Sequence, residues 1–254
     1  MGQLQDITLT ATTTISRRER KRNKKLKPIV QEIQRKILEI KKISPKTTNQ
    51  HKIFKSYQDN NNLFIHGMAG TGKTFLSLYL SLQEVLETEN YKKVIIVRSV
   101  VPTRDMGFLP GNKKEKMKEY EAPYSSICNE LFGRGDSYEL LKSKNLLEFI
   151  PTSFIRGITL NDSIVIVDEA QNLSGHECDS VITRIGHDSK MIFCGDFRQS
   201  DLRFKDEKQG FIDFMEIIHN MSRFDSIEMF EQDIVRSPLV KEYIVMKNKL
   251  GLLV

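Results

Sequence analysis

The chain has 254 residues, of which 39% are hydrophobic, and a formal net charge of +6. That is enough apolar material for one sizeable core, while no run approaches the roughly 20 apolar residues of a membrane span. Three cysteines without paired spacing exclude a disulfide framework, and the opening MGQLQDITLT lacks the pattern of a secretory signal, so we expect a cytoplasmic protein without a membrane partner.

The first predicted element is a basic tail and helix, residues 1–45. Residues 17–46 hold 13 Lys or Arg against three Glu, a net +10, which leaves the rest of the chain at −4. Helical spacing relates four isoleucines: Ile29, Ile33, Ile37 and Ile40. Pro28 suits the first helical position and Pro45 ends the helix. The segment is either a solvated tail followed by a helix docked on the core or a basic arm that contacts nucleic-acid phosphates, and we favour the arm.

From residue 46 onward, short β-branched runs alternate with helical stretches. The predicted strands are 62–66, 92–99, 147–151, 163–169, 190–196 and 226–230. The predicted helices begin at Lys73, after Asn112, after Ser174, after Gln209 and near Pro238. This alternation is typical of an α/β fold, a parallel sheet with helices on both faces, so residues 46–254 are expected to form one domain.

A glycine-rich turn, GMAGTGKT, joins the first strand to the helix at Lys73. It fits the P-loop pattern, in which backbone N–H groups and a helix N-terminus surround phosphates. The predicted nucleotide-binding residues are Gly67, Met68, Ala69, Gly70, Thr71, Gly72, Lys73 and Thr74. Lys73 is expected to neutralise the β- and γ-phosphates, and the Thr74 hydroxyl to bind Mg²⁺. The turn therefore predicts ATP and Mg²⁺ as cofactors.

Two further strands end in polar groups. IVIVDEAQ brings Asp168 and Glu169 to the carboxyl edge of the sheet, where Asp168 is the predicted metal-side residue and Glu169 the catalytic base. MIFCGDFRQ brings Asp196 and Gln199 to the same edge, and Gln199 is the candidate sensor of the γ-phosphate. Three motifs on one edge favour ATP hydrolysis by an activated water.

Taken together these stretches resemble the PhoH-like ATPases, P-loop proteins related to the first motor domain of superfamily 1 helicases. The resemblance covers about residues 46–247 and is carried by TTNQ, GMAGTGKT, VRSVVPTRDMGFLPGNKKEK, APYSSICNELFG, IVIVDEAQN, ITRIGHDSKMIFCGDFRQSDL and FEQDIVRSPLV. It implies a RecA-like core, the adenine beside Gln50, and in Arg236 the arginine that reaches the γ-phosphate. Nothing carries over to the basic N-terminus, which lies outside the family pattern.

Single-stranded nucleic acid, RNA rather than DNA, is the expected partner. Its candidate contacts lie at the end of the strand 92–99 and just after it, namely Arg98, Ser99, Thr103 and Arg104, with Phe108 and Tyr124 as candidate stacking aromatics. These charges could equally be a solvated face. We expect Mg²⁺-dependent ATP hydrolysis coupled to binding or remodelling of that strand. The alternative is a nucleotide-gated binding module or switch without translocation.

A helicase places ATP between two motor domains, and the sequence shows the pattern of the first alone. Arg236 therefore acts either on its own nucleotide or on that of a neighbouring subunit. The second option is favoured, in a head-to-tail homo-oligomeric ring for which a hexamer is the expected size. Arg184 is the competing candidate for this role, and an ion pair with Asp233 is the structural alternative for Arg236.

Overall fold

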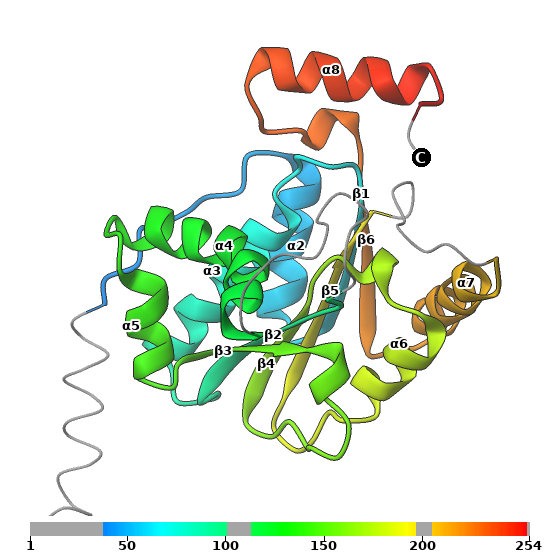
Figure 1. Ribbon diagram of the computed structural model, residues 1–254. Helices are drawn as coiled ribbons and strands as arrows, with labels where there is room; N and C mark the ends of the chain where they lie inside the picture. The colour runs from blue at the N-terminus through cyan, green and yellow to red at the C-terminus, as the bar shows by residue number, and fades with distance from the viewer. Residues whose placement is uncertain (1–37, 101–112, 197–204, 253–254) are drawn as a thin grey trace, which may run out of the picture. The chain divides into compact units, whose positions relative to one another are not determined.

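The computed structural model describes residues 38–100, 113–196 and 205–252, and Figure 1 draws them in colour. The chain from Ile40 onward clusters into one compact unit. None of the described helices has the length and apolar character needed to cross a bilayer.

All six predicted strands are present and lie in one sheet. They are β1 Asn62–Gly67, β2 Lys93–Arg98, β3 Leu147–Pro151, β4 Ser163–Val167, β5 Lys190–Gly195 and β6 Phe224–Met229. Their order is β3-β2-β4-β5-β1-β6, and every neighbouring pair is parallel. Every residue of β4 and β5 is buried, which explains their continuous apolar runs.

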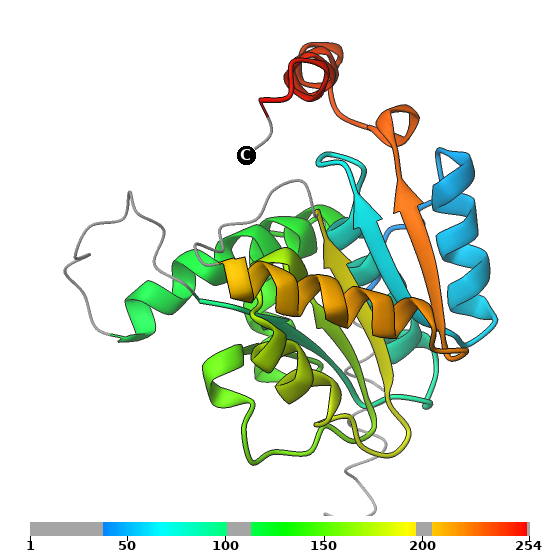
Figure 2. The same ribbon diagram turned by 90° about the vertical axis from the view of Figure 1, so that its right-hand side faces the viewer.

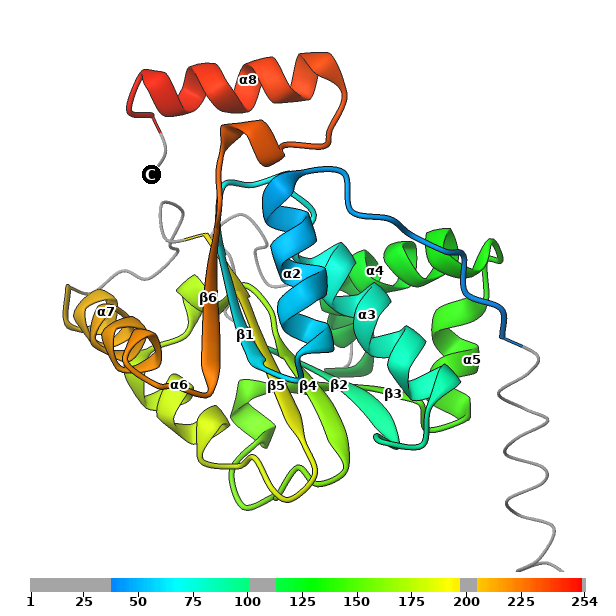
Figure 3. The same cartoon turned by 180° about the vertical axis from the view of Figure 1, so that it is seen from behind.

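Helices cover both faces of this sheet, as predicted. They are α2 Thr48–Gln58, α3 Lys73–Glu87, α4 Lys113–Phe132, α5 Ser137–Ser143, α6 Gly175–Ile182, α7 Lys205–His219 and α8 Pro238–Lys249. Figure 3 shows α2 and α3 on one face, and Figure 2 shows α6 and α7 on the other. Three short 3₁₀ turns complete the described elements, η1 Thr152–Phe154, η2 Ala170–Asn172 and η3 Glu231–Asp233. The predicted α/β class, a parallel sheet with helices on both faces, is confirmed.

The core between the sheet and α6 and α7 is aromatic at its centre. The rings of Phe193 on β5 and Phe214 on α7 meet edge to face with centroids 5.1 Å apart, and Phe64 on β1 packs beside Phe193. Such pairs add to the free energy gained from burying the rings. This core holds β1, β4 and β5 in register, so the loops that follow these strands emerge along one edge of the sheet.

The predicted N-terminal helix is wrong where the structure can test it. Residues 38–46 are irregular, so no helix extends to Pro45, and the part predicted at 28–37 lies outside the described residues. The backbone N–H of Lys41 donates to the carbonyl of Leu131 at 2.8 Å. This hydrogen bond joins the segment to the end of α4 and takes the place of a bond within a helical turn. The segment then leads directly into α2.

Other boundaries also differ from the prediction. α7 begins at Lys205, four residues before Gln209, and Gly210 lies inside the helix because α6 crosses it closely at Gly175. α2 and α5 were not predicted. The start of α2 could have been predicted, because Thr47 is a favoured N-cap residue and its side chain accepts a hydrogen bond from the backbone N–H of Gln50.

Candidate active site

The P-loop between β1 and α3 requires glycine at two points. Gly67 has φ +110°, and a Cβ there would lie 2.2 Å from the carbonyl oxygen of Met229 on β6. Gly72 has φ +88° and forms the N-cap of α3 without any side chain to cover the helix end. The first turn of α3 therefore presents free backbone N–H groups, the arrangement that binds phosphate.

Lys73 is held by this loop. Its ammonium donates to the carbonyl oxygens of Gly67 at 2.7 Å and Met68 at 2.9 Å, while the Thr71 hydroxyl also donates to Met68 at 2.8 Å. Burial lowers the pKa of Lys73, an effect opposed first by the nearby Asp196 carboxylate. The cation thus lies inside the loop that would surround the phosphates.

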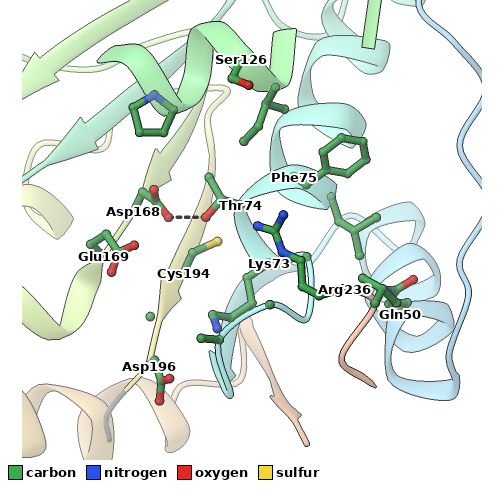
Figure 4. A pocket seen from close by; sticks show the side chains of 18 of the residues that line it. Gln50, Lys73, Thr74, Phe75, Ser126, Asp168, Glu169, Cys194, Asp196 and Arg236 are labelled. Atoms are coloured by element: carbon green, nitrogen blue, oxygen red, sulfur yellow. Dashed lines mark hydrogen bonds between the residues drawn. The ribbon is translucent and has the colours of Figure 1, made fainter. Parts of the chain in front are cut away.

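Thr74 and Asp168 meet across the cleft, although 93 residues separate them in sequence. The Thr74 hydroxyl donates to Asp168 Oδ1 at 2.7 Å, as Figure 4 shows. Asp168 is 4% exposed, and burial, followed by the adjacent Glu169 charge, raises its pKa. Hydrogen bonds from Thr74 and Tyr124 oppose that rise. The two predicted metal-side groups are therefore adjacent.

Glu169 has a left-handed backbone, φ +51°, which directs the chain sharply into η2. Its carboxylate accepts from Gln171 Nε2 at 2.6 Å, and Gln171 Oε1 accepts from the backbone N–H of Asp196 at 2.9 Å. Strain of this kind concentrates at functional sites. Gln171, which is 3% exposed, thereby links the ends of β4 and β5.

These groups line one cleft of about 680 Å³. Figure 4 shows Asp168, Glu169 and Asp196 on one side of this cleft, and Phe75 and Gln50 on the other. The buried Gln50 amide accepts from the Lys46 N–H at 2.8 Å and donates to the Thr71 carbonyl at 3.1 Å, so its orientation is fixed. This arrangement suits one nucleotide, with its phosphates at the P-loop and carboxylates and its base beside Phe75 and Gln50.

No group of three or more His, Cys, Asp or Glu side chains in the described part of the chain could hold a metal ion alone. Thr74 and Asp168 do fit Mg²⁺, because that ion binds through one or two protein oxygens together with water and substrate phosphates. The donor set therefore suits a metal that arrives with the nucleotide.

Arg236 lines the cleft of its own chain. Its Cγ lies 3.0 Å from the point where a Cβ on Gly70 would stand, and Figure 4 shows its side chain directed into the pocket. The backbone N–H of Val235 donates to the Gly70 carbonyl at 3.1 Å, which fixes this segment on the P-loop. The competing Arg184 is not among the residues that line the cleft.

Asp233 does not pair with Arg236 among the described contacts. It is fully buried and accepts from the side chains of Thr47 and Asn49 and from the backbone N–H of Phe230. Burial alone would raise its pKa, but these hydrogen bonds hold the pKa of Asp233 below its usual value. The network joins the start of α2 to the segment that carries Arg236.

Asp233→Ala should lower the free energy of unfolding by about 2 to 4 kcal/mol, because it leaves buried donors without an acceptor. The depressed pKa means that this contribution is present above the ordinary value of 3.8 and is lost as the pH falls through the lower folded-state pKa. Urea unfolding at pH 7 measures this loss. Asp213→Ala, at an exposed position on α7, is the control, and its free energy of unfolding should lie within about 0.5 kcal/mol of that of the original protein. Equal stability of the two variants would contradict the network.

The predicted nucleic-acid residues do not form one exposed surface. Ser99 is 8% exposed and its hydroxyl donates to Glu177 at 3.2 Å, so it supports the N-terminus of α6. Arg98 lines the cleft described above. Tyr124 is fully buried and cannot stack on a base. Thr103, Arg104 and Phe108 lie outside the described residues, as does the candidate sensor Gln199.

The sequence matches one protein-family model over most of its length. A family model described as "PhoH-like protein" matches residues 42–247, which include the P-loop, Asp168, Glu169 and Arg236. The chain belongs to the PhoH-like family. The matched range agrees with the resemblance expected for about residues 46–247.

Known PhoH-like relatives are moderately similar. The PhoH-like protein of Bacillus subtilis (strain 168) is 36% identical over 210 residues, covering 82% of this chain and 65% of the relative. That of Synechocystis sp. is 33% identical over 202 residues, covering 80% and 61%. The chain therefore spans less than two thirds of the length of these relatives. Among solved structures, the Pif1 helicase from Candida albicans is 16% identical with a TM-score of 0.39, over 82% of this chain and 44% of that one.

Three contacts at the site were not predicted from the sequence. Tyr124 donates to Asp168, Gln171 connects Glu169 with the backbone of Asp196, and Asn49 holds Asp233. Gln171 stood inside the DEAQ motif and could have been identified from its place after the acidic pair. The other two contacts join segments distant in sequence, and no local pattern indicates them.

Proposed function

We propose that this PhoH-like chain hydrolyses ATP with Mg²⁺ and couples the reaction to binding or remodelling of single-stranded nucleic acid, RNA in preference to DNA. The observation that carries the ATPase assignment is the 2.7 Å contact between Thr74 of the P-loop and Asp168 at the end of β4, with Glu169 beside it. The nucleic-acid assignment is supported by the +10 charge of residues 17–46 and by the family's likeness to helicase motors.

In the proposed mechanism each group has a separate task. The N–H groups at the start of α3 and the Lys73 ammonium bind the β- and γ-phosphates, and Glu169 accepts a proton from the attacking water. Bound Mg²⁺ would neutralise the charge that develops on the phosphates. Gln171 orients Glu169 through the 2.6 Å bond to its carboxylate. Gln199 keeps its predicted role as sensor, and Gln50 its predicted place beside the adenine.

The deciding experiment is phosphate release from ATP by the full chain, with and without single-stranded RNA, single-stranded DNA and duplexes of matched length. Stimulation by single strands, greater with RNA, is the expected result. Turnover that no nucleic acid changes would favour the nucleotide-gated switch instead. Absence of any turnover, with Mg²⁺ and ATP present, would contradict the ATPase assignment.

We also propose the division of the chain into a basic arm, residues 1–45, and an ATPase domain, residues 46–254. Deleting residues 1–27 should weaken RNA binding and flatten its salt dependence, because each phosphate neutralised on a single strand adds about 0.7 to the slope of log affinity against log salt. Fluorescence anisotropy with labelled RNA over a salt series measures both. A slope that does not change would make the arm a solvated tail.

Assembly into a ring, with a hexamer as the expected size, belongs to the same proposal. From the sequence, Arg236 acts either on its own nucleotide or on that of a neighbouring subunit, and the ring follows from the second option, which is favoured there. The position of Arg236 in the cleft of its own chain supports action within one chain. The mass of the full chain by light scattering, with ATP and Mg²⁺, decides whether a ring forms.

A further inference from the structure

A buried tyrosine stands behind the metal-side carboxylate. Tyr124 lies on α4, next to Pro123, which lines the cleft, and its side chain has no exposed surface. Its hydroxyl donates to Asp168 Oδ2 at 2.9 Å. The other oxygen, Oδ1, accepts from Thr74. The two oxygens of Asp168 are thus held from opposite sides, one by the P-loop helix and one by α4.

A cation lies close to this tyrosine. Arg98, at the end of β2, lines the same cleft, and its positive charge acts on both Tyr124 and Asp168. A guanidinium only donates hydrogen bonds, whereas a tyrosine hydroxyl can accept one while it donates another. A contact from Arg98 to the Tyr124 oxygen therefore agrees with a hydroxyl proton directed at Asp168.

We infer that Tyr124 is a positioning residue for the metal site, which holds the Asp168 carboxylate in the orientation that binds Mg²⁺ and is itself oriented by Arg98. The inference rests on the proposed function and deepens it, since it explains how the metal-side carboxylate is held. It also gives Arg98 a role inside the cleft, different from the nucleic-acid contact expected from sequence.

The physical basis is the freedom of a carboxylate to rotate about its own side chain. Thr74 restrains only one oxygen, and that hydroxyl must turn to the metal when Mg²⁺ binds. The bond from Tyr124 then remains as a fixed restraint on Asp168. Partners of this kind behind a metal ligand are worth about 10- to 100-fold in metal affinity or activity.

Tyr124→Phe tests the role, because it keeps the buried ring and removes only the hydroxyl. Mn²⁺ can replace Mg²⁺ as a spectroscopic probe, and its affinity for the protein with ADP bound is measured by electron paramagnetic resonance. We expect the Mn²⁺ dissociation constant to rise about 10-fold or more. ADP affinity in EDTA should stay within about twofold, since the hydroxyl does not contact the nucleotide side of the P-loop. A merely structural role would change both affinities or neither.

Tyr138→Phe is the matched control. Tyr138 is a buried tyrosine on the neighbouring α5 and is not among the residues lining the cleft, so both affinities should be unchanged. Unchanged Mn²⁺ affinity in Tyr124→Phe would overturn the inference while the proposed function stands. An original protein that binds neither ADP nor Mn²⁺ would overturn the proposed function and this inference with it.

Arg98→Lys supplies an independent variant, since it keeps the positive charge but loses the guanidinium through which Arg98 is inferred to act on the hydroxyl. It should weaken Mn²⁺ binding in the original chain and cause no further loss in Tyr124→Phe, because residues that act through one contact are not additive. A further, additive loss in the double variant would show that Arg98 acts independently of Tyr124 and would overturn the relay.

Discussion

Glu169→Gln should bind ATP normally and lower its hydrolysis by about 10² to 10⁴, the usual contribution of a general base. The amide keeps the size of the side chain and cannot take a proton from water. Glu169 lines the cleft beside Asp168, and its position is fixed by the left-handed backbone and by Gln171. Fluorescent ATP binding and phosphate release, measured on the same preparation, separate the two effects.

Two further variants serve as comparisons for Glu169→Gln, one that should lose nucleotide binding and one that should behave as the original protein. Lys73→Ala should lose both nucleotide affinity and turnover, because it removes the cation held within the loop. Glu216→Gln, on the exposed surface of α7, should change neither. Hydrolysis by Glu169→Gln close to that of the Glu216 control would exclude Glu169 as the base, and another carboxylate of the cleft, Asp196, would then become the candidate.

Arg236→Ala should lower turnover by about 10³ to 10⁵, the range found for arginines that stabilise the charge of a transferring phosphoryl group. The structure favours action on the nucleotide of the same chain, because Val235 is bonded to Gly70 and Arg236 faces the pocket. Mixing Lys73→Ala chains with Arg236→Ala chains should therefore restore no ATPase activity. Arg156→Ala, at an exposed position away from the cleft, serves as the control for loss of a cation.

Recovery of activity in that mixture would contradict action within one chain. It would show that an intact P-loop on one subunit had received Arg236 from another, as the ring predicted from sequence requires. Arg236→Lys distinguishes charge from shape, since a lysine keeps the charge but lacks the planar, forked donors of the guanidinium. The fall in ATP turnover of Arg236→Lys should therefore be nearly as large as that of Arg236→Ala.

Much of the fold could be predicted because its signals are local. The four inner strands, β1, β2, β4 and β5, are short apolar runs, because burial on both faces of a parallel sheet requires such runs. The start of α6 is set by neighbouring residues, since Ser174 and Glu177 cap it reciprocally. The P-loop is local as well, because the positive φ of Gly67 and Gly72 demands glycine at fixed spacing. The P-loop turn could therefore be predicted from the sequence alone.

The predictions that failed depended on contacts between distant segments. The stripe ending at Ile40 was consistent with a helix, but residues 38–46 are irregular and Lys41 bonds to Leu131 of α4. Similarly, Gly210 could mark a helix start by itself, whereas its closeness to Gly175 places it inside α7. In both places a tertiary neighbour outweighed a weak local preference.

The sequence by itself determined the sheet, the P-loop and the acidic pair that follows β4, because each depends on residue types at short, regular spacing. Only the tertiary structure decided that Arg98 and Tyr124 face Asp168, that Ser99 supports α6, and that Arg236 reaches its own cleft. The reason is that parallel strands bring together loops far apart in the chain. Which side chains come into contact depends on packing between these elements, and a local sequence pattern does not predict such contacts.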